Sequence, residues 1–185
     1  MLLVGLIVFI TISLLLFLLS MIWPPDSPWS PWWRTNSTIA RSIIKTAAIT
    51  KNDFIYDLGC GDGTLLVTAG KLVGARGIGV EIDPSRVLIA RIRIITSGLG
   101  SLVKITRGDL FKEDLSRASV VVVYLVPKTL KRLEEKFYKE LHLGTRVVSY
   151  VYPIEYLTEI ARDKKNQVYI YEVLGPNKSS NGKKL

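Results

Sequence analysis

The chain is poor in the side chains that bind metals and form disulfides. Cys60 is its only cysteine and His142 its only histidine among 185 residues. A single cysteine cannot form an intrachain disulfide, and a zinc site built from cysteine and histidine is strongly disfavoured. We expect Cys60 to be a small apolar filler inside a glycine-rich turn and His142 to lie at the end of a charged helix. No metal site is predicted.

Charge is missing from the start of the chain. No Lys, Arg, Asp or Glu precedes Asp26, so the net charge of +9 belongs to the remainder. Residues 2–23 form a nearly unbroken apolar run, long enough as a helix to cross a bilayer. A cleaved signal peptide is the alternative, but it needs a basic start and a small-residue cleavage site, and this run has neither. We predict a retained transmembrane anchor over 1–23 that contacts the lipid bilayer through residues 2–23.

A short stretch rich in proline and tryptophan follows the apolar run. It holds all four tryptophans, Trp23, Trp29, Trp32 and Trp33. Proline makes such a linker, residues 24–35, extended and fairly stiff. Tryptophans favour the headgroup level of a membrane, which is one interpretation. The other is that Trp29 or Trp32 packs against a bound ligand or a substrate cation.

The basic residues nearest the anchor all lie on its C-terminal side. Arg34, Arg41 and Lys45 follow it, and no basic residue precedes it. The positive-inside rule then directs the rest of the chain to the cytoplasm. The basic excess of that part favours anionic partners, among them nucleic acid, acidic proteins and anionic lipids, without choosing between them.

The stretch after residue 53 is typical of a strand, a tight turn and a helix. The apolar run 54–58 leads into Gly59, Gly61 and Gly63, and a helical apolar pattern begins at Thr64. Glycines at such positions let a ligand approach the backbone, and open α/β sheets bind ligands at the carboxyl ends of their strands. The spacing differs from the G-x-G-x-x-G of dinucleotide-binding proteins.

Strand-like and helical patterns alternate through the rest of a predicted domain, residues 36–175. Strands are expected at 77–81, 103–106, 120–126 and 145–151, and helices from 36 or 37 to about 48, from 84 onward, and from 127 to about 141. This alternation predicts an α/β fold with a doubly wound parallel sheet. Residues 157–161 and 168–173 could form a final antiparallel pair, although 157–162 could also be a short helix. The polar tail 176–185 is expected to be disordered.

Acidic residues close three successive predicted strands, at Asp57, Glu81 and Asp109. Together with the glycine turn, the stretches 57–63, 81–83 and 108–109 resemble the class I S-adenosylmethionine-dependent methyltransferases. The resemblance implies a seven-stranded Rossmann-like sheet and S-adenosylmethionine as cofactor. Asp83, in the second of these stretches, is included among the expected cofactor-binding residues.

The resemblance gives each acid an expected role. Glu81 would accept the ribose hydroxyls through its two carboxylate oxygens, and Asp109 would accept from the adenine amino group. Asp57 and the turn of Gly59, Gly61 and Gly63 would hold the methionine part, whose ammonium and sulfonium are cationic. A phosphate ligand would not favour so acidic a site.

Finer features resemble a small family of protein-lysine methyltransferases, which includes archaeal enzymes and the membrane-anchored mitochondrial enzyme that methylates the ATP synthase c-ring protein. These features are the stretches 28–31, 117–121 and 144–149. Trp29 stands where that family has a tyrosine, and a cofactor contact is expected there. The resemblance implies a membrane-anchored protein-lysine N-methyltransferase acting on proteins at or in the membrane, with Tyr124 lining the channel for the lysine.

Two other functions stay open from the sequence. One is methylation of a lipid or another small molecule, and the other is an RNA methyltransferase or a cofactor-binding module without catalysis. The fourth strand ends in Tyr124-Leu125-Val126-Pro127 and lacks the Asn/Asp-Pro-Pro-Tyr signature of enzymes that methylate nucleic-acid amino groups. The basic residues are also scattered and not interleaved with aromatics. Nucleic acid is therefore the least favoured partner.

Overall fold

The computed structural model describes residues 1–22 and 35–174, with side chains for 1–19 and 35–174. Residues 24–34 of the predicted linker, including Trp29, and the predicted tail 176–185 lie outside the described residues. The domain boundaries and the cofactor contact of Trp29 therefore stay predictions.

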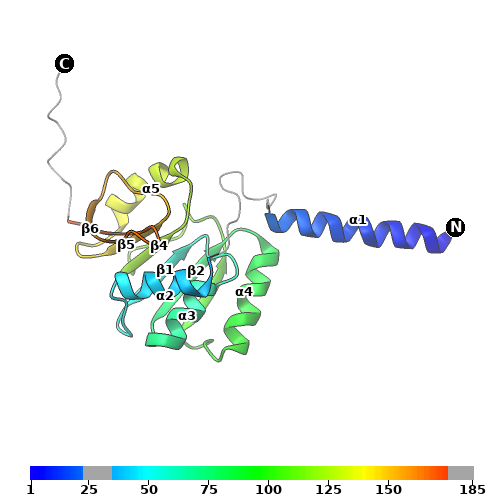
Figure 1. The fold of residues 1–185 in the computed structure, drawn as a ribbon, viewed down its shortest axis with the longest axis horizontal. Coiled ribbons are helices and arrows are strands. Elements are labelled where there is room, and N and C mark those ends of the chain that lie inside the picture. The colour runs from blue at the N-terminus through cyan, green and yellow to red at the C-terminus, as the bar shows by residue number, and fades with distance from the viewer. Residues whose placement is uncertain (23–34, 175–185) are drawn as a thin grey trace, which may run out of the picture.

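A seven-stranded mixed sheet organises the domain (Figure 1). Its order is β3-β2-β1-β4-β5-β7-β6, with parallel pairing from β3 to β5 and antiparallel pairing of β7 with both β5 and β6. The strands are β1 (Phe54–Leu58), β2 (Arg76–Glu81), β3 (Val103–Arg107), β4 (Val120–Val123), β5 (Arg146–Tyr150), β6 (Thr158–Asp163) and β7 (Val168–Glu172). The Rossmann-like methyltransferase sheet is confirmed, and residues 158–163 form a strand, not a helix.

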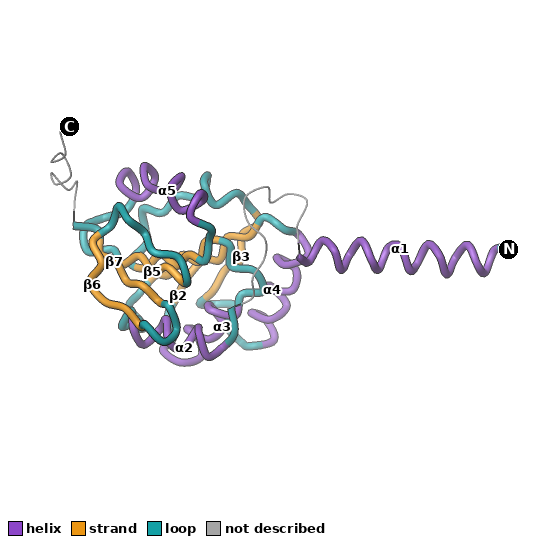
Figure 2. Tube along the Cα trace, turned by 45° about the horizontal axis from the view of Figure 1, so that its top comes forward, coloured by secondary structure: helices purple, strands orange, loops and turns teal. Residues whose placement is uncertain are grey.

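Helices cover both faces of the sheet, as Figure 2 shows. One face carries α2 (Ser37–Thr46), α3 (Thr64–Val73) and α4 (Pro84–Thr96), and the other carries α5 (Pro127–Glu140). Each face has its own apolar core, which includes Ile43, Leu66 and Ile94 beneath the first group and Leu133 and Phe137 beneath α5. The central strand β4 is buried along its whole length because helices pack on both of its sides.

Helix α1 (Leu2–Ile22) carries no charged residue and has a mean hydropathy of 3.1 over Leu2–Leu19. None of that window is buried against the described chain. Its 21 residues span about 30 Å at 1.5 Å each, which matches the hydrocarbon core of a bilayer. The helix is long and apolar enough to cross a membrane, and a signal sequence near an N-terminus would meet the same criteria.

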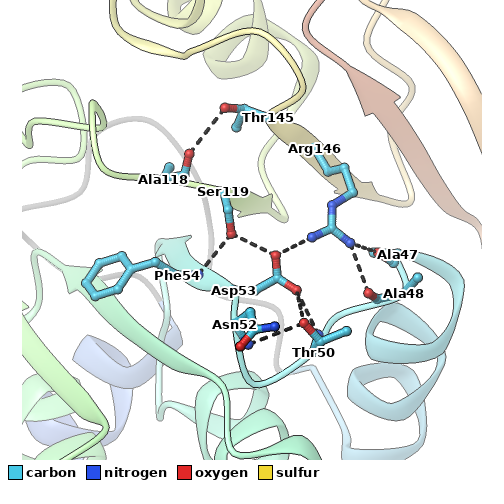
Figure 3. A network of polar contacts seen from close by, with 10 residues as sticks. All are labelled: Ala47, Ala48, Thr50, Asn52, Asp53, Phe54, Ala118, Ser119, Thr145 and Arg146. Atoms are coloured by element: carbon cyan, nitrogen blue, oxygen red, sulfur yellow. Dashed lines mark hydrogen bonds and ion pairs between the residues drawn. The ribbon is translucent and has the colours of Figure 1, made fainter.

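A polar clamp formed by Asp53, Ser119 and Arg146 joins the N-terminal ends of three strands (Figure 3). The Ser119 hydroxyl donates to Asp53 Oδ1 (2.8 Å) and accepts from the Phe54 N–H (2.9 Å). Arg146 pairs with the same carboxylate and donates to the carbonyls of Ala47 and Ala48, just after α2.

The clamp explains two sequence stretches that the family resemblance singled out, 117–121 and 144–149. Burial alone would raise the pKa of Asp53, but hydrogen bonds from Thr50 and Ser119 and the charge of Arg146 outweigh it and lower the pKa. The ionised carboxylate is thus the form that the fold stabilises. The clamp holds β1, β4 and β5 in register, so that their opposite ends meet at one edge.

Candidate active site

A pocket lies at the carboxyl ends of the parallel strands, where open α/β sheets bind ligands. Its empty volume is about 1050 Å³, including the part that opens to solvent. The pocket brings together six of the predicted site residues, Asp57, Gly59, Gly61, Glu81, Asp109 and Tyr124. Gly63 and Asp83 do not line it.

The turn after β1 needs glycine because the backbone takes left-handed conformations. Gly59, Gly61 and Gly63 have φ angles of +83°, +55° and +73°, which other residues rarely adopt. The N–H groups of Gly59 and Cys60 donate to the Val80 carbonyl, which fixes the turn against β2. Gly63 begins α3 as its N-cap. The turn therefore presents bare backbone to the pocket at Gly59 and Gly61.

Cys60 is buried within this turn and packs against Gly79 on β2. A Cβ added to Gly79 would lie 2.7 Å from Cys60 Sγ, so the two positions are closely fitted. Burial raises the pKa of the thiol, with the nearby acids adding to the effect. A thiol that stays protonated is a poor nucleophile, which agrees with the prediction that Cys60 fills space.

Glu81 ties the end of β2 to the glycine turn. Its Oε2 accepts from the Gly61 N–H (2.9 Å), and its Oε1 accepts from the N–H groups of Ile82 (2.9 Å) and Asp83 (3.0 Å). A carboxylate has about four acceptor positions, so one remains on Oε2 for a further donor. A ribose hydroxyl could donate there, and acceptance of both hydroxyls stays a prediction.

The carboxylate of Asp83 caps α4. It accepts from the Arg86 N–H at 3.0 Å. Capping satisfies a helix donor that would otherwise have no partner. The Asp-Pro pair at the start of the helix carried this signal in the sequence. Asp83 thus stands next to the site and positions the loop after Glu81.

Asp57 is the most electrostatically unusual group of the site. Burial, followed by the negative charges of Glu81 and Asp62, raises its pKa to about 7. No hydrogen-bond donor to its carboxylate is found among residues 35–174. A buried acid in this position gains from a cationic ligand, since a positive charge nearby would favour ionisation.

Asp62 and Asp109 complete the acidic side of the pocket. The Asp62 carboxylate pairs with Arg93 (2.6 Å) and accepts from the Thr64 hydroxyl (2.6 Å). Asp109 Oδ1 accepts from the Phe111 N–H at 3.0 Å, which shapes the loop after β3. This loop also brings the Phe111 ring to the pocket, beside the expected adenine partner.

A pair of tyrosines forms the opposite, apolar side. Tyr124 follows β4 and Tyr150 ends β5, and their rings meet edge to face with centroids 4.5 Å apart. Burial raises the pKa of Tyr124, and the neighbouring tyrosines Tyr150 and Tyr152 raise it further. Both rings line the pocket, so this wall consists of neutral phenols and apolar carbon.

The chain turns sharply just after Tyr150. Val151 has a φ of +71° and the Tyr152 N–H donates to the Tyr150 carbonyl at 2.9 Å. A positive φ at a β-branched residue is a strained conformation, and such strain is found most often at functional sites. The turn fixes the end of β5 and with it the ring of Tyr150.

Sequence reasoning missed several residues of this pocket, among them Thr35, Ile43, Phe111 and Tyr150. Tyr150 had a usable signal, because parallel neighbours end at the same edge and β5 follows β4 in the sheet. Ile43 lies on the helix that the sequence predicts from 36 or 37 to about 48, and the packing of α2 on α3 brings that helix to the pocket. Thr35, just before this helix, had no signal.

The pocket suits an adenosyl cofactor that carries cationic groups. Bare backbone at Gly59 and Gly61 leaves space that a Cβ would narrow, and the raised pKa of Asp57 marks a place for positive charge. Asp57, Glu81 and Asp109 lie at the ends of three neighbouring strands or in the loops that follow them, within one pocket. These residues fit S-adenosylmethionine, and their individual contacts to it stay predictions.

Comparison with known proteins places the chain among methyltransferases. Residues 57–161 match the family model described as the ANTKMT methyltransferase domain. A protein-lysine N-methyltransferase of Saccharolobus islandicus is 34% identical over 82% of this chain and 98% of its own length. Adenine nucleotide translocase lysine N-methyltransferase of Mus musculus is 35% identical over 69% of this chain. The chain spans 58% of that mouse protein.

A solved structure is also similar over most of the domain. It is an RNA methyltransferase from Salinibacter ruber in complex with S-adenosyl-L-homocysteine, 31% identical, with a TM-score of 0.75 over 80% of this chain and 98% of that one. The family match begins at Asp57 and continues into β6, so it includes the ends of β1, β2 and β3 where the acidic pocket is built. We conclude that this chain belongs to the family of ANTKMT methyltransferase domains and is an S-adenosylmethionine-dependent methyltransferase.

Proposed function

We propose that this protein is a membrane-anchored protein-lysine N-methyltransferase with substrates at or in the membrane. The observation that carries the proposal is its similarity to the Saccharolobus protein-lysine N-methyltransferase over nearly the whole length of that relative. Similarity to the mouse adenine nucleotide translocase lysine N-methyltransferase, at 35% identity over 69% of this chain, supports it.

The two sides of the pocket suit the two reactants. The acidic side, with Asp57, Glu81 and Asp109, would hold the cofactor, which supplies an electrophilic methyl group when bound. The tyrosine wall of Tyr124 and Tyr150 would receive the lysine side chain. Rings at this place attract an ammonium through their faces, and partial exclusion of water lowers a lysine pKa.

The chain's own residues would act mainly by positioning. The raised pKa of Tyr124 keeps its phenol protonated near neutral pH, so it cannot serve there as a general base. The lysine would lose its proton to water before it enters, and the tyrosines would align its nitrogen toward the cofactor side. Holding two reactants in line can supply much of the acceleration of a transfer reaction.

Helix α1 supports the membrane part of the proposal. It is uncharged, and its length matches a bilayer. Arg34, Arg41 and Lys45 follow it, and basic residues on this side favour a cytoplasmic catalytic domain. Tethering at the membrane would raise the effective concentration of substrates in the same membrane.

RNA is the second candidate substrate, because the Salinibacter relative is described as an RNA methyltransferase. Among the described residues of the domain, Tyr138 is the most exposed aromatic side chain, at 40%. RNA recognition depends largely on bases stacked on exposed aromatic rings. The described surface therefore favours protein over RNA.

The experiment is transfer of labelled methyl groups from S-adenosylmethionine into source membranes, followed by separation of protein, lipid and RNA. Wild type should label the protein fraction, and Glu81→Gln should lose most of that label because Glu81 holds the glycine turn. Glu155→Gln, a change at an exposed acid outside the pocket, should label like wild type. Label confined to lipid or RNA would overturn the substrate assignment and keep the cofactor.

A further inference from the structure

Helix α4 has a second apolar face that nothing in the described chain covers. Val87, Ala90 and Ile94 face the sheet and are buried in the core. Leu88, Ile92 and Ile95 are 60%, 52% and 72% exposed. Their spacing of four and three residues places them on one side of the helix. We call Leu88, Ile92 and Ile95 the outer stripe.

The stretch of chain that carries the outer stripe is basic and contains no acid. Residues 84–108, which form α4, the following turn and the edge strand β3, include five Lys or Arg residues and no Asp or Glu. Arg86 and Arg93 face acids of the pocket. Arg91, Lys104 and Arg107 are exposed. Arg91 also donates to the Ile105 carbonyl through Nε (3.2 Å) and Nη2 (3.1 Å), which fixes it between the stripe and β3.

We propose that the outer stripe docks on an anionic lipid surface. Apolar side chains flanked by cations are the pattern of helices that lie in the membrane interface, and anionic headgroups attract nearby Lys and Arg. If the outer stripe packed against the outer stripe of a second copy of this chain, Arg91, Lys104 and Arg107 would face the same three cations of that copy. Residues 84–108 hold no acid that could separate these like charges. Apolar side chains give an RNA partner nothing to bind. Charge complementarity therefore selects lipid.

The length of chain before the domain makes the contact reachable. Residues 23–34 separate the end of α1 from the start of the described domain. Twelve residues extend at most about 40 Å in any conformation. If α1 is the anchor, as the proposed function holds, the domain cannot move far from the bilayer. The docking proposal rests on the proposed function in this respect only.

Docking would fix how the pocket meets its substrates. Arg86 lines the pocket and lies on the same helix, two residues before Leu88. Helix α4 thus contributes residues both to the outer stripe and to the pocket. A domain docked through the stripe would hold the pocket at a constant height above the headgroups, suited to lysines at the membrane surface.

The test is the depth of two positions in the full-length protein reconstituted in vesicles. Ile92→Cys places a fluorescent label on the stripe, and Ile160→Cys places the same label on β6, at the opposite edge of the sheet, where Ile160 is 49% exposed. The native Cys60 is buried and should stay unlabelled. Vesicles contain phosphatidylcholine with or without phosphatidylglycerol, and brominated lipids serve as quenchers.

Brominated lipids should quench the label at position 92 several-fold more than the label at position 160, and only when phosphatidylglycerol is present. High salt should reduce the difference because the cations are screened. Equal quenching at both positions would overturn the proposal. Protection of position 92 that grows with protein density or appears only with added RNA would also overturn it, in favour of a second copy or RNA.

Alkaline carbonate extraction of the same vesicles tests the anchor separately. If the protein stays in the membrane but the label at position 92 is not quenched, the anchor proposal is retained and the docking proposal is overturned. As a second readout, replacing Leu88 and Ile92 by serine should lower labelling of membrane protein several-fold and leave binding of S-adenosylhomocysteine unchanged. Ile160→Ser is the matched control. Unchanged labelling of membrane protein would contradict the proposal.

Discussion

Asp57 shows how one residue links the fold to its ligand. It closes β1 under the glycine turn, is buried, and faces two other acids, so its pKa is raised to about 7. The native state therefore keeps a proton that the unfolded chain releases near pH 3.8. Stability conferred by this group is complete below that pH and is lost as pH rises toward about 7.

Replacement of Asp57 should change this pH dependence. In wild type, the raised pKa of Asp57 should lower the free energy of unfolding by up to about 1.4 kcal/mol per pH unit between pH 3.8 and about 7. Asp57→Asn should abolish this decrease. The variant should gain stability relative to wild type as pH rises through that range. Urea unfolding at a series of pH values measures it, and parallel curves for the two proteins would contradict the assignment.

The same group should make cofactor binding depend on pH. A cationic ligand favours the ionised carboxylate, so the affinity of wild type for S-adenosylmethionine should rise with pH up to about 7 and then level off. Asp57→Asn should bind weakly at every pH. Calorimetric titration reports both. A flat profile in wild type would place the cation elsewhere.

Tyr124 is the residue on the substrate side whose role can be separated most cleanly. We expect Tyr124→Phe to keep turnover within a few-fold of wild type, because the wall is a neutral ring and not a base. Tyr124→Ala should lose roughly 5- to 30-fold, since loss of a ring facing the positive charge that the lysine nitrogen gains during transfer costs about 1–2 kcal/mol. Steady-state rates with cofactor saturated test this, with Tyr138→Ala as a control outside the pocket. Equal losses for Tyr124→Phe and Tyr124→Ala would indicate a role for the hydroxyl.

Among the elements, β1, β4 and β5 carry polar or site residues at both of their ends. The clamp of Asp53, Ser119 and Arg146 holds their N-terminal ends, and the carboxyl ends carry Asp57, Tyr124 and Tyr150. The planar guanidinium of Arg146 serves one carboxylate and two carbonyls at once. A lysine has a single point of charge and cannot reproduce this fork.

Arg146→Lys should therefore lower the free energy of unfolding by roughly 1–3 kcal/mol, since a lysine leaves the Asp53 carboxylate and the Ala47 carbonyl with fewer donors. Arg162→Lys is the matched control, because the Arg162–Glu159 pair is exposed and such pairs contribute at most about 1 kcal/mol. Urea unfolding compares them. Similar decreases in the free energy of unfolding for the two variants would contradict a stabilising role of the clamp. A changed cofactor affinity in folded Arg146→Lys would show that the clamp also affects the pocket.

The elements were also the part of the molecule that the sequence predicted best. Apolar runs predicted six of the seven strands, and for residues 157–162 the sequence left open a strand or a short helix. The run 120–126 misled at its end, since β4 stops at Val123. Tyr124 and Leu125 leave the ladder to reach the pocket. Apolar composition does not distinguish a buried strand from the buried loop that follows it.

At the scale of the whole molecule, local patterns predicted most of the acidic side of the pocket and only Tyr124 of its tyrosine wall. The glycine turn and the strand-end acids belong to short continuous motifs, so spacing alone located them. Ile43 reaches the pocket through packing between distant segments, and Tyr150 reaches it through the order of the strands. Asp83 was assigned to the cofactor from its place in a motif, and the structure shows its carboxylate capping α4.

Charge is distributed unevenly along the chain. An uncharged helix stands at one end, and the remainder holds a net charge of +9. The acids of the pocket are concentrated within this basic domain, so a cationic cofactor finds a local negative site. The cationic face of α4 and β3 is left for an anionic surface. The proposed anchor and the proposed docking face would together place the pocket at a membrane.

The measurement that tests the central claim most directly is the chemical identity of the methylated product. Source membranes are incubated with methyl-labelled S-adenosylmethionine and the full-length protein, and the labelled protein is hydrolysed to amino acids. Wild type should yield label in methylated lysine, and Glu81→Gln should yield almost none. Label in another amino acid, in lipid or in RNA would contradict the claim that this pocket methylates lysine.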